Sequence, residues 1–119
     1  SGASPDLTIA PPPSFRCLEG LGASLEARVC NRGSEVVGSG VLLSFSRGVG
    51  AGMSETICSV RSSINLEPGR CESLNCAVET VDFGEAMELE LVVDGDETVG
   101  ECREGNNRAR LRVHCPGFG

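Results

Sequence analysis

The chain has 119 residues, seven of which are cysteine and sixteen glycine, and it carries a formal net charge of −7 at pH 7. Its ten basic residues are all Arg, and its only aromatic side chains are four Phe. An acidic chain repels nucleic-acid phosphates, and no apolar run approaches the ~20 residues needed to cross a bilayer, so we expect neither nucleic-acid binding nor membrane insertion.

Seven short segments along the chain alternate between apolar and polar residues, a pattern typical of half-buried β-strands. Prolines at 11–13 end the first segment, and turn signals follow others, among them Asn31-Arg32-Gly33 and Leu66-Glu67-Pro68-Gly69. The sequence therefore predicts an all-β fold, an antiparallel immunoglobulin-like β-sandwich of about seven strands. The expected strands are residues 6–10, 25–30, 41–45, 56–60, 71–78, 87–93 and 109–113.

The length suits one domain. We expect residues 1–119 to form a single unit, with 1–4 a linker or a segment foreign to the domain and 116–119 a tail. We also expect the chain to be a piece of a longer protein, because it lacks an initiator Met.

The cysteines indicate an oxidising compartment. No two of them form a Cys-x-x-Cys pair and His114 is the only histidine, so the usual spacings of a zinc site are missing. Disulfides in an exported domain are the favoured interpretation, and they would compensate for a core that is poor in aromatic side chains. The odd count leaves one thiol over.

A series of short motifs in a fixed order resembles a known family. They are Pro5-Asp6-Leu7-Thr8-Ile9, Val29-Cys30-Asn31-Arg32-Gly33, Leu66-Glu67-Pro68-Gly69, Val93-Asp94 and Glu101-Cys102-Arg103-Glu104-Gly105-Asn106-Asn107. Over residues 5–114 this order is similar to the CARDB domain, a cell-adhesion-related, Ig-like module of bacterial surface and secreted proteins.

The resemblance implies a non-catalytic extracellular module of a larger exported bacterial protein, serving adhesion, protein–protein contact or spacing. Its partner would be a protein or cell-surface component, with further domains in tandem in the same chain, and neither a cofactor nor a catalytic residue is implied. The alternative is an accessory domain that positions substrate beside an extracellular peptidase or glycosidase. Because His114 has no nucleophile arranged with it in the sequence, we expect no independent enzyme.

A sandwich topology limits which cysteines can pair. Where the second and sixth strands run the same way, the end of the second strand lies near the loop after the sixth, and the two outer cysteines meet at the opposite pole. We therefore expect Cys30–Cys102 and Cys17–Cys115. Cys58, Cys71 and Cys76 then share one bond, and the position of Cys76 on the apolar side of its strand favours Cys58–Cys76, which leaves Cys71 over.

A rival set of pairs rests on spacing. Cys17 and Cys30, Cys58 and Cys71, and Cys102 and Cys115 are each thirteen positions apart, so three local loops are a second possibility, ranked below the first set.

The stretch 79–104 holds ten carboxylates and allows two interpretations. One is a calcium loop; the other, which we favour, is a solvated surface in which Glu88 and Glu90 face arginines of the last strand. The spacing of an EF-hand loop is not met. The candidate calcium ligands are Asp94, Asp96, Glu97, Glu101 and Glu104.

Three asparagines are expected to hold loops rather than to bind a ligand. Asn31 belongs to the turn after the second strand, and Asn106 and Asn107 belong to the loop before the last. Asparagine side chains commonly tie down turn backbone by hydrogen bonds to nearby main-chain groups.

Overall fold

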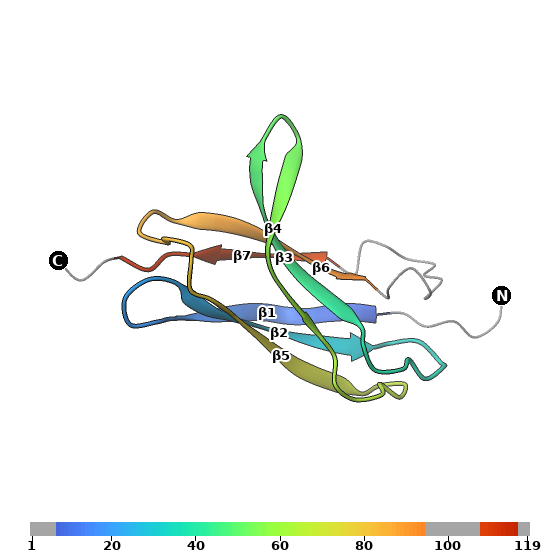
Figure 1. The fold of residues 1–119 in the computed structure, drawn as a ribbon. Coiled ribbons are helices and arrows are strands. Elements are labelled where there is room, and N and C mark those ends of the chain that lie inside the picture. The colour runs from blue at the N-terminus through green and yellow to red at the C-terminus, as the bar shows by residue number, and fades with distance from the viewer. Residues whose placement is uncertain (1–6, 95–107, 117–119) are drawn as a thin grey trace.

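The computed structural model describes residues 7–94 and 108–116, and it shows seven strands in two antiparallel sheets (Figure 1). One sheet has the order β1-β2-β5 and the other has the order β4-β3-β6-β7. The strands are β1 (Leu7–Cys17), β2 (Ala23–Asn31), β3 (Leu42–Gly50), β4 (Met53–Arg61), β5 (Cys71–Val78), β6 (Met87–Asp94) and β7 (Arg108–Val113). The predicted all-β sandwich and its seven strands are confirmed. Among the described residues, no helical segment has the length and apolarity to span a bilayer.

The first strand extends further than the sequence suggested. Residues 11–13 do not end β1; the strand continues to Cys17, with a register shift between Ala10 and Ser14 where it pairs with β2. Proline lacks an N–H group and is tolerated at a sheet edge and in bulges, and β1 is an edge strand. The three prolines therefore interrupt the pairing without stopping the strand.

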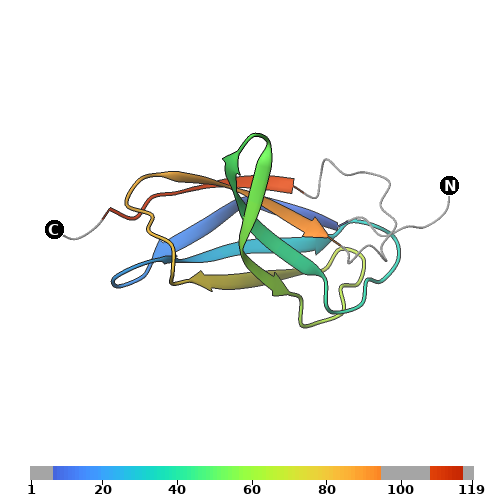
Figure 2. The same cartoon turned by 45° about the horizontal axis from the view of Figure 1, so that its top comes forward.

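The core is one layer of mainly aliphatic side chains between the two sheets, whose strands are seen in Figure 2. Alternate residues of the strands point into it, as the period-2 pattern predicts. Only two of its members are aromatic, Phe45 on β3 and Phe83 on the β5–β6 connection. The fully buried strand residues include Leu25, Val29, Leu43, Leu89, Leu91, Val93 and Val113.

Two disulfides join one sheet to the other, one at each open side of the sandwich. Cys17–Cys115 connects the last residue of β1 to the second residue after β7, and Cys58–Cys76 connects β4 to β5. Both are among the expected pairs. Because β1 faces β7 and β5 faces β4, each bond lies at a side where edge strands of the two sheets meet.

The third disulfide corrects the sequence-based pairing. Cys30 is bonded to Cys71, which lies directly opposite it on the neighbouring strand with the Cα atoms 4.0 Å apart. The predicted Cys30–Cys102 bond is therefore wrong, and so is the expectation that Cys71 is left over. The topology argument for Cys30 used only its place at a pole of the sandwich, whereas its partner lies opposite it within the same sheet. The rival pairs at thirteen-residue spacing are wrong as well, since none of them occurs.

We expect one alkylatable thiol in the native protein, at Cys102. The three bonds use six of the seven cysteines, and Cys102 lies outside the described residues. Alkylation without reductant, followed by proteolysis and mass spectrometry, should place the label on Cys102 and recover a cross-linked Cys30–Cys71 peptide. Label on Cys71, or a Cys30–Cys102 peptide, would contradict the observed pairing.

Candidate functional site

The β3–β4 hairpin projects beyond the body of the sandwich (Figures 1 and 2). Its loop has two residues, Ala51 and Gly52, both at positive φ (55° and 75°), between the paired residues Gly50 and Met53. Two consecutive residues at positive φ are the geometry of a type I′ turn, whose twist suits an antiparallel hairpin. The glycine-rich run 47–52 thus contains the turn of a long hairpin.

Bulges explain why the hairpin leaves the sheet. The β3–β4 register shifts twice, between Phe45 and Ser46 and again between Gly48 and Gly50. Each shift places an extra residue in one strand, which bends the pair and increases its twist. Pairing of β3 with β6 stops at Arg47, so the described part of the tip has no neighbouring strand on either side.

Side-chain pairs support the hairpin where the core does not reach. Arg47 Nη2 lies 2.9 Å from Glu55 Oε1 across the two strands, and the hydroxyls of Ser46 and Thr56 are 3.2 Å apart. Such exposed cross-strand pairs contribute a few tenths of a kcal/mol each. The hairpin tip, defined here as residues 48–54, is exposed throughout and buries no side chain in the core.

Two large apolar side chains are exposed on this tip. Val49 retains 52% and Met53 66% of its accessible surface. Single exposed apolar residues are common on any surface, but here two of the four exposed large hydrophobic residues in the described chain sit on one projection. The sequence did contain this signal, since both residues lie in a run that is otherwise glycine, alanine and serine.

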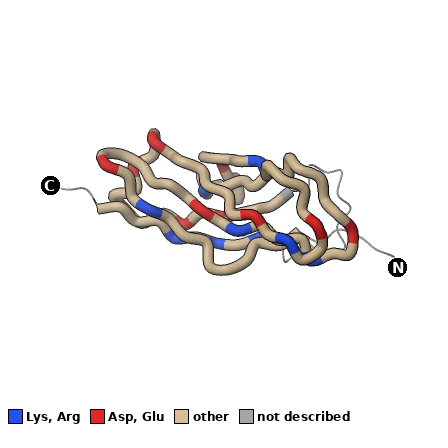
Figure 3. The backbone as a smooth tube through the Cα atoms, turned by 90° about the horizontal axis from the view of Figure 1, so that it is seen from below, with Lys and Arg blue, Asp and Glu red and all other residues tan. Residues whose placement is uncertain are grey.

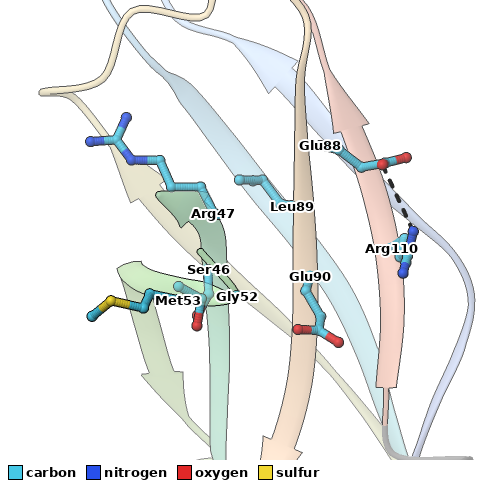
Figure 4. Close-up of a pocket in the computed structure, with 10 residues that line it drawn as sticks. Ser46, Arg47, Gly52, Met53, Glu88, Leu89, Glu90 and Arg110 are labelled. Atoms are coloured by element: carbon cyan, nitrogen blue, oxygen red, sulfur yellow. Dashed lines mark ion pairs between the residues drawn. The ribbon is translucent and has the colours of Figure 1, made fainter. Parts of the chain in front are cut away.

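A groove of about 290 Å³ runs between the hairpin and the outer face of the four-stranded sheet (Figure 4). Met53 and Ser46 lie on its hairpin side, and Glu88, Glu90 and Arg110 lie on its sheet side. The groove therefore combines apolar surface with charges of both signs. It can offer hydrogen bonds and salt bridges to a polar partner.

The charges beside the groove form ion pairs between β6 and β7. Glu90 Oε2 is 3.0 Å from Arg108 Nη1, and Glu88 Oε1 is 3.8 Å from Arg110 Nη1. The pairs are diagonal, because the register places Glu90 opposite Arg110 and Glu88 opposite Arg112. This is the solvated carboxylate surface expected for Glu88 and Glu90. Figure 3 shows Arg and Glu interspersed along the strands.

The described residues hold no metal cluster, and the one histidine of the chain contacts the main chain. No group of three or more His, Cys, Asp or Glu in this part of the chain is placed to hold a metal ion. The Nε2 of His114 lies 3.1 Å from the Gly84 carbonyl oxygen, so that ring nitrogen carries the proton in this contact. The imidazole is exposed and engaged with the main chain.

Most of the candidate calcium ligands and two of the three asparagines lie outside the described residues. Asp96, Glu97, Glu101, Glu104, Asn106 and Asn107 fall in 95–107. Of the candidate ligands, only Asp94 is placed, as the last residue of β6. The calcium hypothesis therefore stays untested.

Of the three asparagines expected to hold loops, Asn31 is the one within the described residues, and it is the last residue of β2. Its side chain is fully buried, and both of its polar atoms form hydrogen bonds. The Nδ2 atom donates to the carbonyls of Glu35 (2.7 Å) and Leu66 (2.8 Å). Its Oδ1 accepts the N–H of Gly33 at 2.8 Å, which forms an Asx turn. One amide thus ties the loop after β2 to the loop before β5.

The main chain of Asn31 completes the same junction. Its N–H donates to the Arg70 carbonyl at 3.0 Å, and its carbonyl accepts the N–H of Gly69 at 2.7 Å. The Cys30–Cys71 bond lies directly beside these contacts. Hydrogen bonds and a covalent bond therefore fix the same end of the β2–β5 pair.

This arrangement of strands defines an immunoglobulin-like β-sandwich. Comparison with solved structures shows that, among such sandwiches, the chain has a CARDB-like fold. The crystal structure of the CARDB domain of a Pyrococcus furiosus protein, in complex with di-metal ions, matches with a TM-score of 0.62 and 23% identity. That match covers 93% of this chain and 88% of the other.

Two further solved structures share the fold. A solution NMR structure of a domain from a Methanosarcina acetivorans protein, named as a cell surface protein, has a TM-score of 0.65 at 18% identity, covering 93% of this chain and 91% of that one. A β-glucosidase from Thermotoga neapolitana, in complex with α-D-glucose, has a TM-score of 0.52 at 15% identity; the match covers 94% of this chain but 16% of the enzyme. No protein-family model and no curated protein matches the sequence.

We expect Asn31→Ala to lower the free energy of unfolding by about 3 kcal/mol, because it removes the Asn31 partner of the Glu35 carbonyl and of the Gly33 N–H and one of the two hydrogen bonds to the Leu66 carbonyl in a buried junction. The exposed Asn75 on β5 provides a matched control, and Asn75→Ala should change stability by less than about 0.5 kcal/mol. Urea denaturation followed by far-ultraviolet circular dichroism suits this chain, which has no Trp or Tyr. Equal stabilities for the two variants would show that the Asn31 contacts are not required.

Proposed function

We propose that this domain is a non-catalytic, exported surface module that contacts a protein or cell-surface partner through the hairpin tip. The observation that carries the proposal is the projection of residues 48–54 from a CARDB-like sandwich with two apolar side chains exposed. Loops and projections on a rigid scaffold are common binding elements. The tip can be covered by a partner without any change in the core.

The open strand edges of the tip favour an extended peptide segment as the contacting element. On one side Gly48 to Gly50 lie beyond the last residue that pairs with β6, and on the other β4 is the edge of its sheet. A strand added to such an edge gains main-chain hydrogen bonds, and neighbouring side chains supply specificity. Val49 and Met53 would supply apolar contacts, and Arg47 and Glu55 charged ones.

Two observations support an exported location. Three disulfides persist in oxidising compartments and are rare in the cytosol. One structural neighbour is named as a cell surface protein. Adhesion, protein–protein contact and spacing within a larger protein are all compatible with this location.

An accessory domain beside an extracellular hydrolase is the second candidate. It is favoured by one observation, that the same fold occurs within 16% of a β-glucosidase chain. The neighbouring domains of the parent protein distinguish the two: a catalytic domain beside this one favours the accessory role, whereas tandem sandwiches favour adhesion or spacing.

The hairpin proposal predicts a localised contact. A photo-cross-linking residue placed at Met53 of the full-length protein, on the cells that produce it, should give a discrete adduct identifiable by mass spectrometry. The same residue at Glu67, which is exposed in the β4–β5 turn, serves as the control and should give none. Adding Val49→Ser should reduce the Met53 adduct by about tenfold, the effect of losing ~1.4 kcal/mol of binding free energy.

Comparable adducts at Met53 and Glu67, or an adduct that is insensitive to Val49→Ser, would argue against the hairpin tip as the contact. Circular dichroism of the variants checks that the sandwich remains folded. Because Val49 is exposed, its replacement should leave the melting temperature unchanged.

A calcium titration tests the favoured interpretation of the acidic stretch. The CARDB domain from Pyrococcus furiosus binds two metal ions, whereas we propose that the carboxylates of this chain form a solvated surface. Isothermal titration with Ca²⁺ should then release no heat and leave the melting temperature unchanged. A saturable heat that disappears with Asp96→Asn and Glu101→Gln together would instead establish a metal site in the loop.

A further inference from the structure

The Cys17–Cys115 bond encloses almost the whole domain in one covalent loop. It joins residues 98 positions apart, the last residue of β1 and the second residue after β7. Strands β2 to β7 and both other disulfides therefore lie inside the loop. Outside it, the described chain consists only of β1 on one side and Pro116 on the other.

Strand β1, which lies outside the covalent loop, runs along the direction in which tension between the two chain ends would act. β1 starts at one end of the sandwich and runs to the opposite end, where β7 also finishes (Figure 1). Its pairing with β2 extends from Leu7 opposite Asn31 to Cys17 opposite Ala23. A tension between the chain ends would therefore enter at Leu7, pass along an extended strand and leave through the disulfide.

We propose that β1 and the Cys17–Cys115 bond form a covalent strut that fixes the length of the domain under tension, whether or not its core is folded. Force applied to the two ends is carried by β1 and the bond, because β2 to β7 lie inside the covalent loop and are not part of the shortest covalent connection. Unfolding therefore lengthens the connection only by the straightening of β1. This inference goes beyond the proposed contact function, because it rests on covalent connectivity and is independent of what the hairpin binds.

The geometry sets the size of the effect. In the folded domain β1 runs alongside β2 from Asn31 to Ala23, which is eight residue steps. At ~3.3 Å per residue, β1 therefore spans about 26 Å. Drawn out fully, its ten steps reach about 36 Å at ~3.6 Å per residue, so complete unfolding lengthens the oxidised domain by only about 10 Å.

Without the strut, the connection becomes much longer. In a Cys17→Ser/Cys115→Ser variant, the shortest covalent path runs from Leu7 to Cys30, across the remaining bond to Cys71, and on to position 115. That path has about 67 steps and a contour length of about 240 Å, which is roughly 200 Å more than the native span. Full reduction of the wild-type chain raises the contour length to about 390 Å.

Single-molecule force spectroscopy on the full chain, held between two marker domains, measures these lengths directly. The oxidised wild type should show no unfolding step above about 10 Å, and its contour length at high force, which includes the residues before Leu7 and after Cys115, should exceed that of the markers by only about 80 Å. The Cys17→Ser/Cys115→Ser variant should gain about 200 Å. The contour length at high force does not depend on folding, so the test holds even if that variant is unfolded.

A second double variant provides the matched control. Cys58→Ser/Cys76→Ser also removes one inter-sheet bond, but that bond lies inside the loop, so this variant should keep the short contour length of the wild type. An unfolding step of 50 Å or more in the oxidised wild type, or a long contour length in this control, would overturn the strut. Loss of the hairpin adduct described above would leave these lengths unchanged, which keeps the two proposals separable.

Discussion

The sandwich depends on one thin layer of aliphatic side chains that both sheets must share. With only Phe45 and Phe83 as buried aromatic residues, this layer offers less apolar area than a core built around large rings. Covalent bonds complement it at the two open sides, where β1 meets β7 and β4 meets β5. The sheets are therefore held by apolar packing in the middle and by disulfides at the edges, a division of roles common in small exported domains.

Local patterns in the sequence were sufficient to predict the fold as an antiparallel β-sandwich. Alternation such as Leu89 and Leu91 between Glu88 and Glu90 has only one arrangement that buries the apolar side, and the structure has it. Turn residues such as Pro68 and Gly69 indicated where the predicted strands begin and end. The exception is β1, where the sequence shows three prolines but not that the strand lies at an edge and so tolerates them.

Long-range features were harder to predict, because they depend on strand register. Cys30 and Cys71 pair since β2 and β5 are aligned residue by residue, and no local signal contains that alignment. The projecting hairpin depends likewise on two bulges between β3 and β4. Asn31 lies between these cases: its Asx turn with Gly33 follows from the local motif, whereas its contact with Leu66, 35 residues away, follows only from the fold.

The type I′ turn at Ala51 and Gly52 has a consequence for how such a domain can diversify. The hairpin tip is specified by its own two strands and shares no side-chain packing with the core. Replacement of the tip by another sequence of the same length would therefore leave the stability of the sandwich almost untouched. One scaffold could then acquire new partners by exchanging a few residues, with selection for recognition and selection for folding acting on separate parts of the chain.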